Sequence, residues 1–297
     1  MRGVGLWLVN EIVASPTAAV RPPLVIAQLP LGAGSRTVRV SLPVGYSESD
    51  TTYPVIYMFD GQNLFDPSTA TYGKSWDLGR VMGRLTSEDP DLAAVIVGID
   101  SPDDKLDRCA DYTVWDWTFR LRPEADDGRP IIATGRETAA WLLEAVKPWA
   151  EHTFRIHHDP EFVTIAGSSL GGYMSLYTEA RFPGQFGSVL AFSPAVLDFP
   201  MHGDRLRAFL VNRAAPHPAR IYLDMGDAED LEYIEDSQVL VTSLSPLVTS
   251  LQVSGHSEIA VRVVPGAGHD EPAWGARFAD AYRWARTGIA AFGFQSE

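Results

Sequence analysis

The chain has 297 residues, of which 45% are hydrophobic and 21% charged, and its formal net charge at pH 7 is -14. This composition is typical of a globular protein with a sizeable buried core, and it excludes a disordered or fibrous chain. An acidic surface repels phosphate groups, so we expect neither nucleic acid nor an anionic membrane face as a partner.

The N-terminal segment, residues 1–35, is expected to be an irregular or strand-like lead-in. Its apolar stretch MRGVGLWLVN is interrupted at Asn10 and Glu11, which makes it too short to span a bilayer and a poor signal peptide. A cytoplasmic location is therefore the default expectation. The one cysteine, Cys109, has no second cysteine to pair with and lacks the flanking residues of a cysteine-enzyme motif, so we interpret it as a small packing residue.

The predicted elements begin with strands and continue with strands that alternate with helices. Residues 36–42 alternate in polarity like a half-buried strand. Residues 54–59 and 93–99 are continuous apolar runs, typical of strands buried on both faces of a parallel sheet. Later runs of strand length are 162–166, 188–192, 220–223 and 260–264, and the helical segments are 136–151, 170–181 and 276–291.

This alternation predicts an α/β fold in one domain, residues 1–297. We expect a mainly parallel central sheet with helices on both faces and an antiparallel pair at its N-terminal edge. Residues 100–135 fit neither pattern. They hold Trp115, Trp117 and Phe119 among many charged residues, and we interpret them as a long loop or small insertion near the binding site.

The strongest local motif is GSSLGG, residues 167–172, a G-x-S-x-G sequence between a buried strand and a helix. A serine on such a sharp turn has strained backbone angles and leaves no room for side chains two residues to either side, so Gly167 and Gly171 are needed. The turn presents Ser169 at the carboxyl end of the sheet and at a helix N-terminus. Ser169 is therefore the candidate nucleophile.

A serine nucleophile needs a base and an acid, which in sheets of this type follow it in the order acid, then histidine. Of the seven histidines in the chain, His269 stands after the last expected strand, in the glycine-rich turn PGAGHDEPAW. It is therefore the candidate base. The other histidines stand too early in the chain. His152, His157 and His158 precede Ser169, His202 and His217 precede the strand that leads to the acid, and His256 precedes the last strand.

The candidate acid lies in DMGDAED, residues 224–230, after the expected strand 220–223. Its task is to accept the second N–H of the imidazole, so it must stand on the turn just past the strand end. Glu229 and Asp227 fit best, and Asp230 is a third candidate. The spacing of these acids does not match an EF-hand loop, and we expect neither a metal nor an organic cofactor.

A second part of the reaction site is expected in the loop DGQNLF, residues 60–65, which follows the strand 54–59. Backbone N–H groups in such a loop and in the turn after the nucleophile stabilise the oxyanion of acyl transfer. The expected donors are Gln62 and Leu170. Asp60 is expected to brace the loop rather than to take part in the chemistry.

These features together resemble the putative esterase family of α/β-hydrolases, the branch that contains esterase D, the enterochelin and feruloyl esterases and the mycolyl transferases. The resemblance covers residues 36–290, nearly the whole chain. It rests on MFDGQNLFD, a helix ending in Lys147-Pro148, AGSSLGGYMSLY, AFSPA, a Gly-x-x-Glu after the next strand and a Gly-His before the last helix. It implies an α/β-hydrolase fold and acyl-ester hydrolysis by a serine triad.

The resemblance also implies roles for single residues. Glu229, three residues after Gly226, corresponds to the acid of the family, and Gln62 corresponds to its oxyanion donor. The segment DYTVWDW, residues 111–117, is similar to a Tyr-Thr-Pro segment near the family's active site, with Val114 where proline is usual. The residues expected to contact substrate are Asp60, Gly61, Tyr112 and Trp115.

We therefore expect a serine carboxylic ester hydrolase that acts on a small-molecule ester through an acyl-enzyme. Three alternatives remain open, of which one is a lyase or peptidase on the same scaffold. An acyltransferase on the same fold would resemble the mycolyl transferases, which are secreted, whereas this chain lacks a convincing signal peptide. A binding module without activity would normally have lost a member of the triad, and none is missing. The oligomeric state is left open.

Overall fold

The computed structural model describes residues 9–13, 22–120, 128–197, 203–213, 218–231 and 238–289, with residues 9–13 as backbone only. His202, His217 and the end of the expected helix 276–291 lie outside the described residues.

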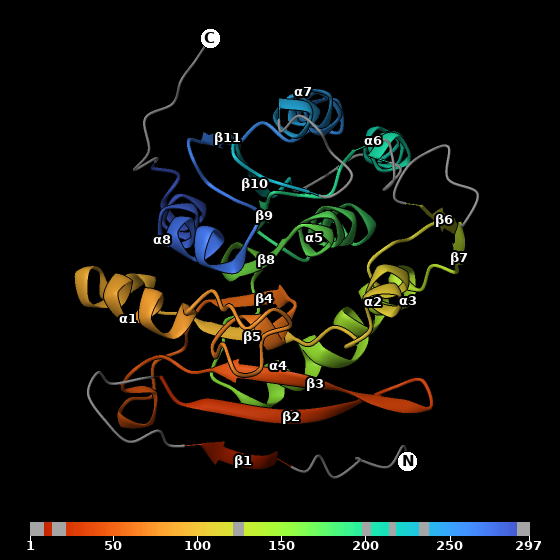
Figure 1. Ribbon diagram of the computed structural model, residues 1–297. Helices are drawn as coiled ribbons and strands as arrows, with labels where there is room; N and C mark the ends of the chain where they lie inside the picture. Colours follow the sequence, from red (N-terminus) through yellow and green to blue (C-terminus); the bar gives the residue numbers. More distant parts are fainter. Residues whose placement is uncertain are drawn as a thin grey trace.

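A nine-stranded sheet crosses the described part of the chain in the order β1-β2-β3-β5-β4-β8-β9-β10-β11 (Figure 1). The strands from β5 to β11 pair in parallel, and β1, β2 and β3 pair antiparallel at one edge. The mainly parallel sheet with an antiparallel N-terminal edge is thus confirmed. The strands are β1 Val9–Val13, β2 Leu24–Leu31, β3 Gly34–Ser41, β4 Val55–Phe59, β5 Val95–Ile99, β8 Val163–Ser168, β9 Ser188–Phe192, β10 Arg220–Gly226 and β11 Ile259–Val264.

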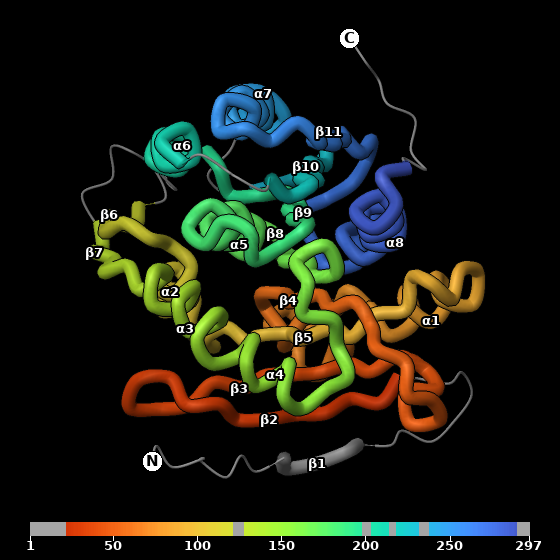
Figure 2. Tube along the Cα trace, turned by 180° about the vertical axis from the view of Figure 1, so that it is seen from behind, coloured from red at the N-terminus to blue at the C-terminus, as the bar shows by residue number. Residues whose placement is uncertain are grey.

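Helices cover both faces of this sheet, as Figures 1 and 2 show from opposite sides. One buried cluster joins the sheet to α1 and α8, and another joins its other face to α3, α4, α5, α6 and α7. Because the central strands are apolar on both faces, each face needs such a cover. The helices are α1 Leu78–Glu88, α2 Lys105–Asp111, α3 Gly135–Trp141, α4 Lys147–Thr153, α5 Leu170–Arg181, α6 Gly203–Val211, α7 Gln238–Val253 and α8 Glu271–Thr287.

Within the expected N-terminal lead-in, the described residues include β2, which is a member of the sheet. It pairs with β3 over its whole length through a tight turn at Gly32, whose φ is 57°. Val25, Ala27 and Leu29 alternate along β2 and are buried. The apolar alternation of residues 24–31 is therefore the sequence signal of a strand with one buried face.

The expected helix 136–151 is interrupted rather than continuous. A π-helical segment, Leu142–Val146, separates α3 from α4, and Pro148 lies two residues after its end. A proline has no N–H to donate, and its ring clashes with the carbonyl group four residues earlier. Widening of the helix before a proline relieves this clash.

Residues 100–135, expected as a loop or insertion, contain regular structure. The helix α2 begins at Lys105, and a short antiparallel pair, β6 Trp117–Phe119 and β7 Arg129–Ile131, forms a separate sheet. Residues 121–127 between these strands lie outside the described part. Trp117 is buried and donates its ring N–H to the hydroxyl of Thr113 in the same segment, 3.1 Å away. Tyr112, Trp117 and Ile131 belong to the buried cluster that covers one face of the sheet, so this segment packs onto the body of the fold.

Candidate active site

Ser169 stands on a strained turn between β8 and α5. Its φ is 55° and its ψ is -123°, angles that a residue with a side chain rarely adopts. A Cβ atom built on Gly167 would lie 2.5 Å from the carbonyl carbon of Gly171, so these residues can meet only as glycines. The turn is held by the Ser169 N–H, which donates to the Phe192 carbonyl at 3.0 Å. This is the geometry of a nucleophile elbow.

The sheet order brings the predicted residues to one edge. Ser169 follows β8, Glu229 follows β10 and His269 follows β11, and these strands are parallel neighbours of β9 or of one another. The carboxyl ends of parallel strands lie at the same edge of a sheet, where ligands bind in open α/β folds.

Glu229 and His269 are in direct contact. The Nδ1 atom of His269 lies 2.8 Å from Oε2 of Glu229, and the carboxylate is fully enclosed while the imidazole is partly exposed. A carboxylate at Nδ1 holds the proton there, so Nε2 is left as the basic nitrogen. The edge of the His269 ring also packs against Trp274, with ring centroids 4.9 Å apart.

The other carboxylate oxygen of Glu229, Oε1, accepts two further hydrogen bonds. The Gly226 N–H donates at 2.7 Å and the Ser193 hydroxyl at 2.5 Å. Burial by itself would raise the pKa of Glu229, but the contact with His269 and these two donors outweigh it and lower the pKa below its ordinary value. The charged form of this acid is therefore stabilised.

The alternative acids of the same turn have other partners. The Asp227 carboxylate accepts the Gly266 N–H at 2.6 Å and so ties the turn after β10 to the turn after β11. Asp230 is exposed to solvent. Among the three candidates, Glu229 is the one in contact with His269.

Asp60 braces the loop that follows β4. It lies in the left-handed region at φ 58°, and its carboxylate accepts two hydrogen bonds of 2.7 Å from the Arg108 guanidinium. Its backbone N–H donates to the hydroxyl of Tyr112 at 3.0 Å, and Tyr112 is fully buried beneath it. The predicted substrate contacts of Asp60 and Tyr112 stay predictions, since both polar groups already have protein partners.

Gln62 is locked by its side chain. Its amide nitrogen donates to the Ser101 hydroxyl at 2.8 Å, and its amide oxygen accepts the Ser101 N–H at 3.0 Å. Gln62 is the second residue of a short 3₁₀-helix, Gly61–Asn63, and Leu170 is the first residue of α5. The first N–H groups of a helix have no acceptor within it, which suits both residues as oxyanion donors.

Gly61 fits closely against the neighbouring strand. A Cβ atom at this position would lie 2.6 Å from the carbonyl carbon of Gly98 in β5. Trp115 is half-buried and packs edge to face on Tyr177 of α5 and Phe209 of α6, at centroid distances of 6.4 and 6.1 Å. Their predicted contact with substrate also remains a prediction.

Glu271 is a site residue that the sequence patterns did not point to. It is buried at the start of α8, and its Oε1 accepts the Asn63 side-chain N–H at 3.0 Å. This bond joins the loop of Gln62 to the helix that follows His269. Burial, together with the nearby charges of Asp60 and Asp270, raises the pKa of Glu271. Its only sequence signal is an acid at the first turn of a helix, which is also a common capping feature.

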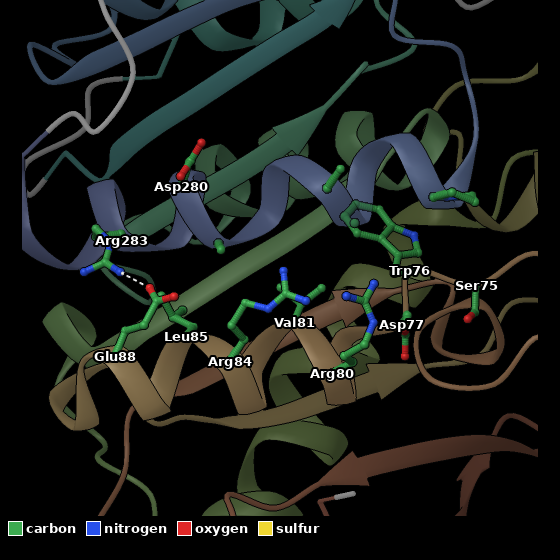
Figure 3. A pocket seen from close by; sticks show the side chains of 14 residues that line it. Ser75, Trp76, Asp77, Arg80, Val81, Arg84, Leu85, Glu88, Asp280 and Arg283 are labelled. Carbon is green, nitrogen blue, oxygen red and sulfur yellow. Dashed lines mark hydrogen bonds and ion pairs between the residues drawn. The ribbon is translucent and has the colours of Figure 1, made fainter. Parts of the chain in front are cut away.

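A groove of about 580 Å³ lies between α1 and α8, away from the turn of Ser169 (Figure 3). Arg80 and Arg84 of α1 extend across it toward α8, and Arg283 of α8 pairs with Glu88. Trp76 at its floor packs against Trp274, 5.7 Å away between ring centroids, so the groove backs onto the helix that supports His269.

Within the described ranges, no group of His, Cys, Asp and Glu side chains could hold a metal ion. The part of the chain that the structure describes also contains no helix long and apolar enough to cross a membrane.

The doubly covered parallel sheet, the strained serine turn and the Glu–His contact at its edge define the class of α/β-hydrolase fold proteins with a serine elbow. The chain belongs to the esterase family described as "Putative esterase", whose model matches residues 33–285. It is a carboxylesterase-type hydrolase.

Several known proteins are similar to this chain. The chain is 22% identical to the uncharacterized protein YbbA of Bacillus subtilis over 254 residues, 85% of this chain and 93% of that protein. It is 31% identical to the ferri-bacillibactin esterase BesA of the same species over 149 residues, which is 48% of each chain. The siderophore hydrolase EstA of Aspergillus nidulans has the same fold, with a TM-score of 0.68 at 19% identity over 93% of this chain and all of that one (100%).

Proposed function

We propose that the protein hydrolyses a small-molecule carboxylic ester through an acyl-enzyme formed on Ser169, with His269 as base and Glu229 as its acid. The observation that carries this proposal is the 2.8 Å contact between His269 Nδ1 and the buried Glu229 carboxylate, on the same sheet edge as the serine turn. This contact orients the imidazole with Nε2 free to take a proton.

In the proposed reaction, Ser169 Oγ attacks the ester carbonyl carbon and gives its proton to His269 Nε2. The N–H groups of Gln62 and Leu170 donate to the oxyanion, and losing one such donor typically costs about 100-fold or more in rate. The carbon–oxygen bond to the alcohol then breaks, and the imidazolium returns the proton to the leaving alcohol. Water repeats the sequence on the acyl-enzyme and releases the acid.

The test compares the purified protein with Ser169→Ala on p-nitrophenyl acetate, butyrate and octanoate, and on ferri-bacillibactin because BesA is named for it. We expect turnover by the wild type and a loss of about 10³-fold or more in the variant. A fluorophosphonate probe should label the wild type and not Ser169→Ala.

Acyl transfer would appear in the same assay as ester products when an alcohol acceptor is added. A wild type that neither turns over any ester nor takes up the probe would contradict the proposal and favour a binding module.

A further inference from the structure

Ser193 lies directly after β9, between the strands that carry the nucleophile and the acid, and it is 1% exposed. Its hydroxyl oxygen has three partners. It donates to Oε1 of Glu229 at 2.5 Å, and it accepts from Trp274 Nε1 at 2.9 Å and from Arg277 Nη2 at 3.1 Å. The hydroxyl group is therefore fully engaged, next to the triad acid.

The direction of each of these bonds follows from the chemistry of the partners. An indole N–H and a guanidinium N–H can only donate, so Trp274 and Arg277 occupy both lone pairs of the Ser193 oxygen. The one hydroxyl proton then has Glu229 as its acceptor. A threonine, alanine or glycine at this position would lose this arrangement or crowd it, whereas serine supplies the single proton that the carboxylate accepts.

The backbone conformation at Ser193 favours glycine, so the presence of a side chain at this position needs a reason. Its φ is 42°, in the left-handed region that a glycine adopts more easily than any other residue. The turn is held by the Ser193 N–H, which donates to the backbone carbonyl and to Oδ1 of Asp224 at 3.0 and 3.1 Å. A side chain in this conformation is retained at a cost, and its contact with Glu229 explains why.

Arg277 is itself fixed behind Ser193. Its Nε and Nη2 atoms lie 2.8 and 2.9 Å from the carboxylate of Asp224, and both side chains are buried. Tyr222 donates a third hydrogen bond to this carboxylate at 2.9 Å. Ser193 thus links a rigid, buried ion pair to the acid of the triad.

We propose that Ser193 is a positioning residue for the triad acid: its hydroxyl, oriented by Trp274 and Arg277, holds Oε1 of Glu229 so that Oε2 faces His269. This proposal rests on the proposed function. In this proposal Ser193 contacts neither the substrate nor any reacting atom, and it acts only through Glu229.

The test measures kcat and KM as a function of pH for Ser193→Ala and Ser193→Gly. Removing one hydrogen bond to a charged, buried group predicts a fall in kcat of about 10- to 100-fold with KM changed less than about threefold. The acidic limb of kcat/KM should move to higher pH, because the lost donor dipole had its positive end toward Glu229 and His269. The other titratable or charged groups around this pair are the same in the wild type and in both variants: Asp224, Arg277, Tyr222, Asp270, Glu271 and Lys74.

The two variants separate positioning from folding. Glycine suits the positive φ, so Ser193→Gly should fold at least as readily as Ser193→Ala and still show the shifted limb and the lower kcat. Ser193→Cys keeps a weak donor and should fall between the wild type and the alanine variant. Should the alanine variant fail to fold, the glycine and cysteine variants decide.

Wild-type kcat and an unshifted acidic limb in both Ser193→Gly and Ser193→Ala would overturn the proposal. Fluorophosphonate labelling of Ser169 in the wild type checks the proposed function separately. Labelling of the wild type with no effect at Ser193 rejects the positioning role alone, whereas a wild type with neither labelling nor ester turnover rejects the triad itself.

Discussion

At the scale of single residues, the two oxygens of one carboxylate have different partners. Oε2 of Glu229 faces the imidazole, and Oε1 is held by Gly226 and Ser193. Asp227, two residues earlier on the same turn, points instead to the Gly266 N–H. The turn therefore separates a carboxylate that contacts His269 from one that ties two loops together.

This separation predicts different outcomes for two conservative substitutions. Glu229→Gln should lower kcat by about 10³- to 10⁴-fold, because an amide can hold the wrong imidazole tautomer and cannot stabilise the imidazolium. Asp227→Asn should keep kcat within about fivefold, since a neutral oxygen can still accept the Gly266 N–H. Steady-state kinetics on p-nitrophenyl butyrate measure both.

Asp230→Asn is the control for a lost surface charge, because Asp230 is exposed. If Asp227→Asn lost as much activity as Glu229→Gln, the assignment of the acid would be wrong.

Residues differ in how far the sequence could predict them. The motif around Ser169 carries a steric requirement for glycine, so the strained turn could be predicted, and chain order pointed to His269. The choice between Glu229 and Asp227 depends on where each side chain points from one turn, which spacing alone does not determine. Ser193 and Glu271 had no chemical pattern of their own, since their roles come from partners more than 30 residues away on the chain.

At the scale of elements, the helix that begins at the nucleophile is fixed near its other end by a buried pair. Glu179, in the last turns of α5, lies 3.4 Å from Nε2 of His256, and both side chains are 2% exposed. His256 Nδ1 also lies 3.1 Å from the Ala219 carbonyl, next to β10. The pair therefore connects α5 to the loops that lead into β10 and β11.

This pair predicts a stability that depends on pH. Burial by itself would lower the pKa of His256, but Glu179 and the Ala219 carbonyl outweigh it and raise the pKa above its ordinary value of about 6.5. A raised folded-state pKa stabilises the fold fully below about pH 6.5, and this contribution is lost as the pH rises through the folded-state pKa. Urea unfolding between pH 6 and 9 should show the free energy of unfolding of the wild type fall relative to that of His256→Gln.

His152→Gln, at an exposed histidine near the end of α4, is the matched control and should follow the wild type. A constant difference between the wild type and His256→Gln over this pH range would contradict the prediction.

The elements that the sequence did not predict have identifiable physical reasons. The helix α7 contains Pro246 and several β-branched residues, which weaken a helical pattern, and its stability comes from leucines packed into the core. The hairpin of β2 and β3 lies next to the edge strand β1. Its first strand contains Pro30, which weakens a strand pattern because proline cannot donate a ladder hydrogen bond. Buried central strands, by contrast, were predicted well because a continuous apolar run of strand length, bounded by turn residues, is typical of a strand covered on both faces.

At the scale of the whole molecule, the order of strands and helices predicts the fold, whereas the net charge predicts which partners are excluded. The alternation of strands and helices predicted a mainly parallel α/β fold, and the resemblance to the esterase family implied the α/β-hydrolase fold; the strand order and the similar solved structures confirm both. The net charge of -14 says nothing of the fold, but it bears on partners.

The charge predicts that the protein does not bind nucleic acid. Repulsion between an acidic surface and phosphates leaves no counterion release to drive association. A mobility-shift experiment with duplex DNA should show no complex even at about 50 mM salt, where binding through charge is strong. A complex that weakens steeply with added salt would show that a local basic surface overrides the net charge.

The distribution of the site over β8, β9, β10 and β11 also has a consequence during synthesis of the protein. The strained serine turn is complete once α5 can pack on β8, yet the imidazole follows it by 100 residues and is held by a helix that comes later still. A nascent chain emerges from the ribosome N-terminal end first. If His269 is the base, as proposed, the growing polypeptide carries an unassisted serine while the 100 residues from Ser169 to His269 are synthesised, and esterase activity begins only when the segment through α8 has left the exit tunnel.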